Sequence, residues 1–283
     1  MFICCSCSKK ESVKKTIQEH HLCKFFQYML LESGGAYTLF GDKPVTLEDI
    51  SYPNDDDLKK LKQCREEILK KNPNFKFRTI EKTLNNDWKM SKDYLSALKM
   101  DNFIFIEVFP DHFFPRESLI VFINIEKTAL TLQKYYSEFS RELQMDFDPL
   151  KTVYEIKDPT SKFWQGVWKK PFLLGLLLGY GYENSRLCSW CIQHNDSTCP
   201  EIKSFITFLH EKAYGADTND PLIKYPIKLD GKPFRLPIFA CHDKETSQAL
   251  IEKYKRQRKE ILRIYKNKDF LQVTLSKLQN NEP

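Results

Sequence analysis

The stretch "NFIFIEVFPDHFFPRESLIVFINI" (residues 102–125) decides the fold class of this chain. Both of its ends are rich in β-branched and aromatic residues, which are typical of strands, and a loop with two prolines separates them. The stretch therefore predicts an antiparallel hairpin at about 102–125. Residues 126–144 follow with the apolar spacing of a helix. A strand-strand-helix run of this kind is typical of the centre of an α+β domain.

Helical spacing dominates the chain on both sides of this hairpin. On the N-terminal side it predicts helices at about 11–31, 55–71 and 86–99, while "AYTLF" (36–40) predicts a short strand and "GDKPV" (41–45) a turn. On the C-terminal side it predicts helices at about 162–182, 183–193, 200–213, 244–268 and 269–278. Prolines between 221 and 237 indicate short strands and loops. The sequence thus predicts a helix-rich α+β fold with a small antiparallel sheet.

The composition is that of a globular protein. The 283 residues are 41% hydrophobic and include 21 Phe, which is enough apolar material for a large core. The longest apolar run, "PFLLGLLLGYGY" (171–182), has about half the length of a membrane-spanning helix. We expect a single α+β domain over residues 11–283, and an α-rich C-terminal lobe from about residue 160 is the other division that the sequence allows.

The first residues, "MFICCSCSKKES" (1–12), resemble the end of a bacterial lipoprotein signal. Apolar residues and a serine precede Cys7, which would accept the lipid, and a polar tether follows it. Only six residues precede Cys7, fewer than a secretory signal needs. Three interpretations stay open. Residues 1–10 are a truncated signal with the true start upstream, which places a lipid-anchored protein in the periplasm or envelope; they are a thiol cluster of a cytoplasmic protein; or they bind a metal.

The net charge of +6 belongs to one segment. Residues 244–268 hold nine Lys or Arg against three Glu, and the rest of the chain is balanced. An apolar stripe in this segment would pack on the protein and leave the basic residues on the flanks, among them Lys255, Arg256, Arg258 and Lys259. These residues form either an ordinary solvated face or a contact for an acidic protein or an anionic membrane surface. Nucleic acid is disfavoured, because aromatic residues placed to stack on bases are not evident.

The segment "CSWCIQHNDSTC" (188–199) is the strongest metal candidate in the sequence. Cys188, Cys191, His194 and Cys199 are four donors of the kind that tetrahedral zinc prefers. Their spacing is not that of two separated zinc knuckles, so a disulfide or ordinary thiols are the alternatives. We expect no cofactor besides this zinc.

No catalytic signature emerges from the sequence. "SGGAYTLFGDKP" (33–44) has five residues between Gly35 and Gly41 and lacks the Lys of a phosphate-binding loop after Gly41. "GYGYEN" (179–184) lacks the third glycine of a dinucleotide site. Cys241 and His242 are neighbours in the sequence, and neighbours at a strand end normally point apart. The sequence therefore nominates no catalytic residue.

Three segments together resemble an uncharacterised family of proteins from obligate intracellular bacteria, several of which look like lipoproteins. They are "YTLFGDKPVT" (37–46), "LLGLLLGYGYENS" (173–185) and "LPIFACHDKETSQALIEKYKRQRKEIL" (236–262). The resemblance implies no reaction. It implies that "YTLFGDKP" is a recurring surface or turn, with Tyr37, Asp42 and Lys43 as contacts for a partner.

The sequence leaves two functions from different classes. The leading expectation is a non-enzymatic envelope or host-interaction protein that is anchored through Cys7. The alternative is a cytosolic enzyme, for example a hydrolase, with its site between the "YTLFGDKP" turn and "GYGYEN".

Overall fold

The computed structural model describes residues 17–51, 80–110, 117–194, 228–237 and 244–280, together with isolated helical positions between 59 and 70. Several predictions fall outside the described residues: the helix at 200–213, the pair Cys241 and His242, the lipid-attachment residue Cys7 and the candidate zinc ligand Cys199. The side chain of Cys191 also lies outside the described part.

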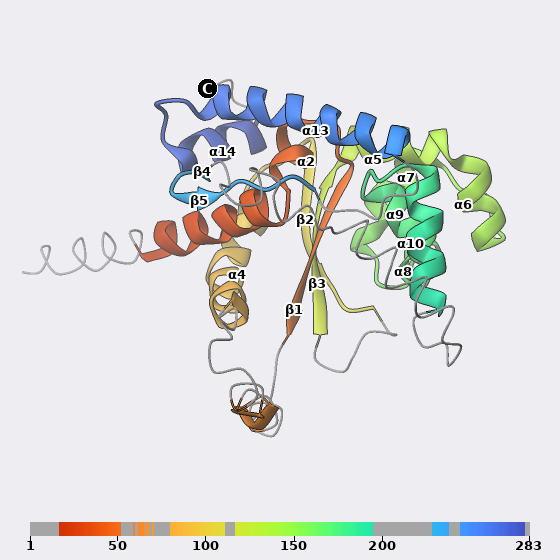
Figure 1. Cartoon of the computed structure of the whole chain (residues 1–283), viewed down its shortest axis with the longest axis horizontal. Helices are drawn as coiled ribbons and strands as arrows, with labels where there is room; N and C mark the ends of the chain where they lie inside the picture. Colours follow the sequence, from red (N-terminus) through yellow and green to blue (C-terminus); the bar gives the residue numbers. More distant parts are fainter. Residues whose placement is uncertain are drawn as a thin grey trace, which may run out of the picture.

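A three-stranded antiparallel sheet forms the centre of the molecule (Figure 1). Its strands are β1 (Val45–Ser51), β2 (Phe103–Val108) and β3 (Glu117–Asn124), in the order β1-β3-β2. The predicted hairpin is confirmed, because β2 and β3 pair antiparallel with Phe105 opposite Phe122. Strand β3 is central, and it pairs with β1 on its other side.

Both faces of the sheet are buried. On β3, Ile120 and Phe122 point into one hydrophobic core, while Leu119, Val121 and Ile123 belong to the other. Successive side chains of a strand point to opposite faces, so a strand that is covered on both faces needs apolar residues at nearly every position. This is the physical reason for the continuous apolar runs that revealed β2 and β3 in the sequence.

The first core is covered by the two ends of the chain. Its helices are 17–26 with the π-helical continuation η1 (Gln27–Glu32), α2 (Ala36–Phe40), α4 (Ile80–Ala97), α13 (Lys244–Tyr265) and α14 (Phe270–Leu278). The short strands β4 (Lys228–Leu229) and β5 (Lys232–Pro233) lie beside η1. In Figure 1, α13 runs along one edge of the molecule, across the end of the sheet.

The second core is covered by the middle of the chain. Its helical elements are α5 (Ile125–Lys134), α6 (Tyr136–Leu143), α7 (Pro149–Tyr154), η2 (Glu155–Lys157), α8 (Lys162–Trp168), α9 (Pro171–Leu177) and α10 (Tyr182–His194). Helices α9 and α10 pack closely, because a Cβ atom at Gly175 would lie only 2.8 Å from the Cβ of Ser185. Glycine at this position allows the two helices to approach. The division of the chain into domains stays a prediction.

Three predicted elements are wrong in detail. "AYTLF" forms the buried helix α2 instead of a strand, and the left-handed turn at Gly34 (φ 78°) precedes it. The third strand is β1, which directly follows the turn that includes Pro44. The long helices predicted at 126–144 and 162–182 are each divided into two, the first at Tyr135.

Candidate functional site

The three segments that carry the family resemblance meet in space. The Tyr37 and Tyr254 rings lie edge to face, with centroids 5.2 Å apart. The Tyr254 hydroxyl donates a hydrogen bond of 3.4 Å to the carbonyl of Gly179. A Cβ atom at Gly179 would lie 3.2 Å from Pro44 and 3.8 Å from the Lys43 side chain. We call this meeting point, formed by Tyr37, Lys43, Gly179 and Tyr254, the junction.

Lys43 is buried in the junction. Among the described residues its side chain has one hydrogen bond, from Nζ to the Thr46 hydroxyl at 3.0 Å, and only 3% of the residue is exposed. Burial lowers the pKa of Lys43 to about 7, and the Glu48 carboxylate opposes this shift. A pKa near 7 suits a catalytic base, but a substrate could reach Nζ only if the junction opened.

Glu48 anchors the polar network beside Lys43. Its carboxylate accepts hydrogen bonds from the Tyr28 hydroxyl at 2.5 Å and from the Ser33 hydroxyl at 2.6 Å. Burial raises the pKa of Glu48, and these two hydrogen bonds oppose the rise. The Thr38 and Thr46 hydroxyls lie 2.8 Å apart in the same region. The polar residues on this face of β1 therefore tie the strand to η1 and α2.

Tyr37 is fully buried between aromatic rings. It packs against Phe234 and Tyr254, and its hydroxyl donates to the Arg235 carbonyl at 3.1 Å. Burial raises the pKa of Tyr37. In the described structure the contacts of Tyr37 and Lys43 are with the protein itself, so both stabilise the junction. Their contact with a partner stays a prediction.

Asp42 lies at the surface and connects the turn to α13. Its carboxylate accepts a hydrogen bond from the Gln257 amide at 2.9 Å and pairs with Lys253 at 3.3 Å. More than half of the Asp42 side chain is exposed. Of the three residues predicted on this motif, Asp42 is therefore the one that solvent reaches.

Helix α13 separates its charges from its apolar residues. Tyr254, Ile261 and Tyr265 are buried in the first core. On the opposite side lie four exposed residues that we call the basic stripe: Arg256, Lys259 and Arg263 of α13, and Lys266, which directly follows the helix. Lys255 lies beside the basic stripe and pairs with Glu252 at 2.9 Å.

Arg258 is the exception among the predicted basic contacts. It is 95% buried, and its guanidinium donates a weak hydrogen bond of 3.5 Å to the Phe234 carbonyl. Its spacing from Tyr254 and Ile261, four and three residues away, places it on the buried face of α13. Lys255, Arg256 and Lys259 remain available to a partner.

The candidate zinc ligands are only partly described. His194 stacks on Trp190 with centroids 4.5 Å apart, and its Nδ1 lies 2.8 Å from the Trp190 carbonyl oxygen. Cys188 carries a thiol and forms no disulfide. Across the described part of the chain, no three Cys, His, Asp or Glu side chains are grouped as a metal site. Zinc bound by Cys188, Cys191, His194 and Cys199 stays a prediction.

Sequence reasoning missed Thr46 and Glu48. The one sequence signal for these residues is strand alternation in "VTLEDIS" (45–51). Val45 and Leu47 face one core, and Thr46 and Glu48 point to the other face of the sheet. Without their partners, two polar residues at these positions look like a loop, because burial of polar groups requires hydrogen bonds that only the fold supplies.

Comparison with protein-family models, with curated proteins and with solved structures gives no match. Within the described residues, none of the helices combines the length and the apolarity needed to cross a membrane.

Proposed function

We propose that this protein is a non-enzymatic interaction protein that works against an anionic membrane surface, with the basic stripe of α13 as its docking face. The observation that carries the proposal is the alignment of Arg256, Lys259 and Arg263 on the solvent side of α13, with Lys266 directly after its end, while the other side of the helix packs in the core. Attachment through a lipid on Cys7 completes the proposal and makes the protein a component of the bacterial envelope.

The basic stripe has the dimensions and charge of an electrostatic contact. Arg256 and Arg263 are seven residues apart on α13, which corresponds to about 10 Å, and Lys266 directly follows the end of the helix. Each Lys or Arg close to an anionic membrane contributes about 1 kcal/mol. Glu260 pairs with Arg263 at 2.7 Å and Glu252 lies at one end, so the net attraction is smaller than four full contributions.

A membrane surface fits this face better than a folded acidic protein does. Protein interfaces are usually centred on buried aromatic or aliphatic anchors. In the described part of the chain, none of the large apolar side chains that are exposed lies on α13. The apolar side of α13 is occupied by the core, so the helix would rest on lipid headgroups without inserting. Weak electrostatic attraction combined with a lipid anchor is the usual two-signal arrangement for stable attachment.

Vesicle binding tests the basic stripe. The full chain is expected to co-sediment with vesicles that contain phosphatidylglycerol and not with pure phosphatidylcholine, and added salt should release it. Changing the four stripe residues to Gln is expected to weaken this binding at least ~10-fold, because most of the local positive charge is lost.

A matched control removes the same charge elsewhere. Lys89, Lys92, Lys151 and Lys157 are exposed positions outside α13, and their replacement by Gln should leave vesicle binding nearly unchanged. If both variants lose vesicle binding equally, the binding depends only on the net charge of the protein, and the basic stripe is not its docking face. If the protein binds polyglutamate and does not bind anionic vesicles, the partner of the basic stripe is an acidic protein and not a membrane.

Palmitate labelling tests the anchor. The product of the full gene, expressed in a bacterium with lipoprotein processing, is expected to incorporate label into the membrane fraction, and Cys7→Ser should abolish it. Cys23→Ser serves as the control, since Cys23 lies within the folded helix at 17–26. Labelling that persists in Cys7→Ser, or its absence from the unaltered protein, would remove the lipid anchor from the proposal and leave the basic stripe to be judged alone.

A further inference from the structure

An open hollow lies between α6, α9 and α10, away from the junction. Its volume of about 680 Å³ is in the range of small-molecule sites. Helix α10 contributes one wall with Tyr182, Arg186, Ser189, Trp190 and Gln193, all within three turns. We call this feature the α10 hollow.

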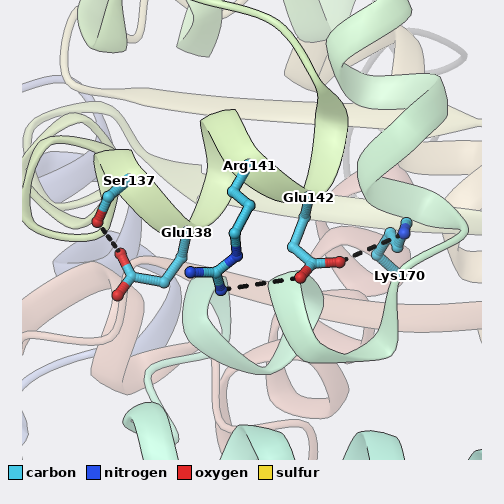
Figure 2. A network of polar contacts seen from close by, with 5 residues as sticks. All are labelled: Ser137, Glu138, Arg141, Glu142 and Lys170. Atoms are coloured by element: carbon cyan, nitrogen blue, oxygen red, sulfur yellow. Dashed lines mark hydrogen bonds and ion pairs between the residues drawn. The ribbon is translucent and has the colours of Figure 1, made fainter.

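Around the α10 hollow, cations outnumber carboxylates by one: Arg141, Arg186 and Lys170 against Glu142 and Glu183. Arg141 and Glu142 reach it from α6, and Figure 2 shows the Glu142 carboxylate between Arg141 and Lys170. Glu142 lies 3.3 Å from Lys170 Nζ and 3.8 Å from the Arg141 guanidinium, so two cations already compensate its charge. Arg186 from α10 adds another positive charge.

The guanidinium of Arg186 is held by an aromatic ring. It lies over Tyr182 at 5.8 Å from the ring centroid, and the edge of Tyr182 packs on Phe172 with centroids 5.4 Å apart. Stacking of this kind orders the planar group and leaves its N–H donors for an anion. A guanidinium binds phosphate oxygens through two parallel hydrogen bonds.

The other end of the α10 hollow offers a ring and an amide. Trp190 is one turn beyond Arg186, and its indole stacks on the His194 imidazole with an interplanar angle of 25°. Gln193 follows on the same face of the helix. Ser189, between Arg186 and Trp190 along this wall, adds a hydroxyl. A cationic end, a hydroxyl and an aromatic end thus follow one another along about 10 Å of helix.

We propose that the α10 hollow binds a mononucleotide. The phosphate lies against Arg186 and Arg141, the ribose lies near Ser189, and the base packs against Trp190 with its polar edge toward Gln193. A simple anion such as phosphate would contact only the arginines and would make no contact with Trp190 and Gln193.

Tryptophan fluorescence provides a direct test with the full chain. Of the four Trp residues, Trp88, Trp164 and Trp168 are buried, so Trp190 is the one that a ligand in the hollow would contact. Titration with AMP, GMP, CMP and UMP is expected to give saturable quenching with at least one of them. Trp190→Phe should abolish the quenching while calorimetry still detects binding.

Substitution of Arg186 tests the phosphate end. Arg186→Gln is expected to weaken mononucleotide binding at least ~10-fold, because a charge-assisted bidentate contact is lost. Lys92→Gln, at an exposed position of α4, is the charge-matched control and should bind as the unaltered protein does. The parent nucleoside should bind more weakly than its monophosphate by a similar factor.

Three results would overturn the proposal. One is the absence of quenching and of calorimetric heat for all four mononucleotides at millimolar concentration. Another is inorganic phosphate binding as tightly as any mononucleotide, which would describe an anion site without recognition of a base. The third is equal affinity of Arg186→Gln and the unaltered protein, with far-UV circular dichroism showing that both are folded.

Discussion

Replacing Phe122 with alanine is expected to lower the free energy of unfolding by about 4 kcal/mol, the usual cost of truncating a fully buried aromatic residue. Phe122 lies at the middle of the central strand β3 and is completely buried. Its ring stacks on Phe105 of the paired strand with centroids 4.1 Å apart and an interplanar angle of 8°, and it also contacts Phe103. The cavity would open where the sheet meets the first core, so the neighbouring strands could not close it without shifting their register.

Urea denaturation followed by circular dichroism measures this loss. Phe109→Ala is the matched control, because Phe109 directly follows β2 and is 65% exposed. The control should change the free energy of unfolding by less than ~0.5 kcal/mol, as surface substitutions usually do. A loss below ~1.5 kcal/mol for Phe122→Ala would mean that the neighbouring side chains collapse into the cavity and that the ring is not held as tightly as its burial indicates.

The parts of the fold that the sequence predicted are those whose pattern follows from burial alone. Strands β2 and β3 are apolar at nearly every position because helices cover both faces of the sheet. Strand β1 has the same two covered faces, but one of them carries Thr46 and Glu48. These side chains are satisfied by Thr38, Tyr28 and Ser33, which are distant or unrecognisable as partners until the fold is known. The pattern of β1 could therefore not be read as a strand.

The candidate sites differ in the same way. The basic stripe was predictable, because its residues lie in one short segment of the chain and follow one helical periodicity. The buried position of Arg258 was predictable from the same spacing, since Tyr254 and Ile261 lie on its face of α13. The α10 hollow could not be predicted, because Arg141 and Arg186 are 45 positions apart in the sequence. Only the packing of α6 near α10 brings both side chains to one hollow. The periodicity within one helix gives no information about which residues of distant helices line the same hollow.

The stability of the protein is expected to rise by about 2 kcal/mol between about pH 6 and pH 8.5 through Lys43 alone. The pKa of Lys43 is about 7 in the folded protein, against an ordinary value of 10.5. The unfolded chain therefore binds more protons than the folded one between these two values, and stability increases with pH across that window. Below pH 7 the buried amine is charged with one hydrogen bond, and the full cost of its burial is present.

Other shifted groups act outside this window or against it. Tyr37, Tyr254 and Tyr265 have raised pKa values, so they lower stability only above about pH 10, where the unfolded chain begins to ionise. Cys23 also has a raised pKa and acts near pH 9 and above. Glu48 has a raised pKa and gives the opposite slope, beginning at its ordinary value of 4.5. Asp49 has a pKa raised by burial and gives the same slope as Glu48. The contribution of Lys43 is therefore separated best by comparison with a variant that lacks its amine and keeps these groups.

Lys43→Met isolates this contribution. Methionine fills similar volume without a charge, and the Thr46 hydroxyl keeps its contact with Thr38, so no buried polar group loses its only partner. The variant is expected to be more stable than the unaltered protein at about pH 6, and the difference between the two should shrink by about 2 kcal/mol toward pH 8.5. Urea denaturation at five pH values measures the difference, and Lys89→Met, at an exposed position of α4, should keep the slope of the unaltered protein. If Lys43→Met shows the same change of stability with pH as the unaltered protein, the Lys43 amine is not enclosed in the junction. The YTLFGDKP turn would then be accessible to solvent, and Lys43 could serve as the base of an enzyme.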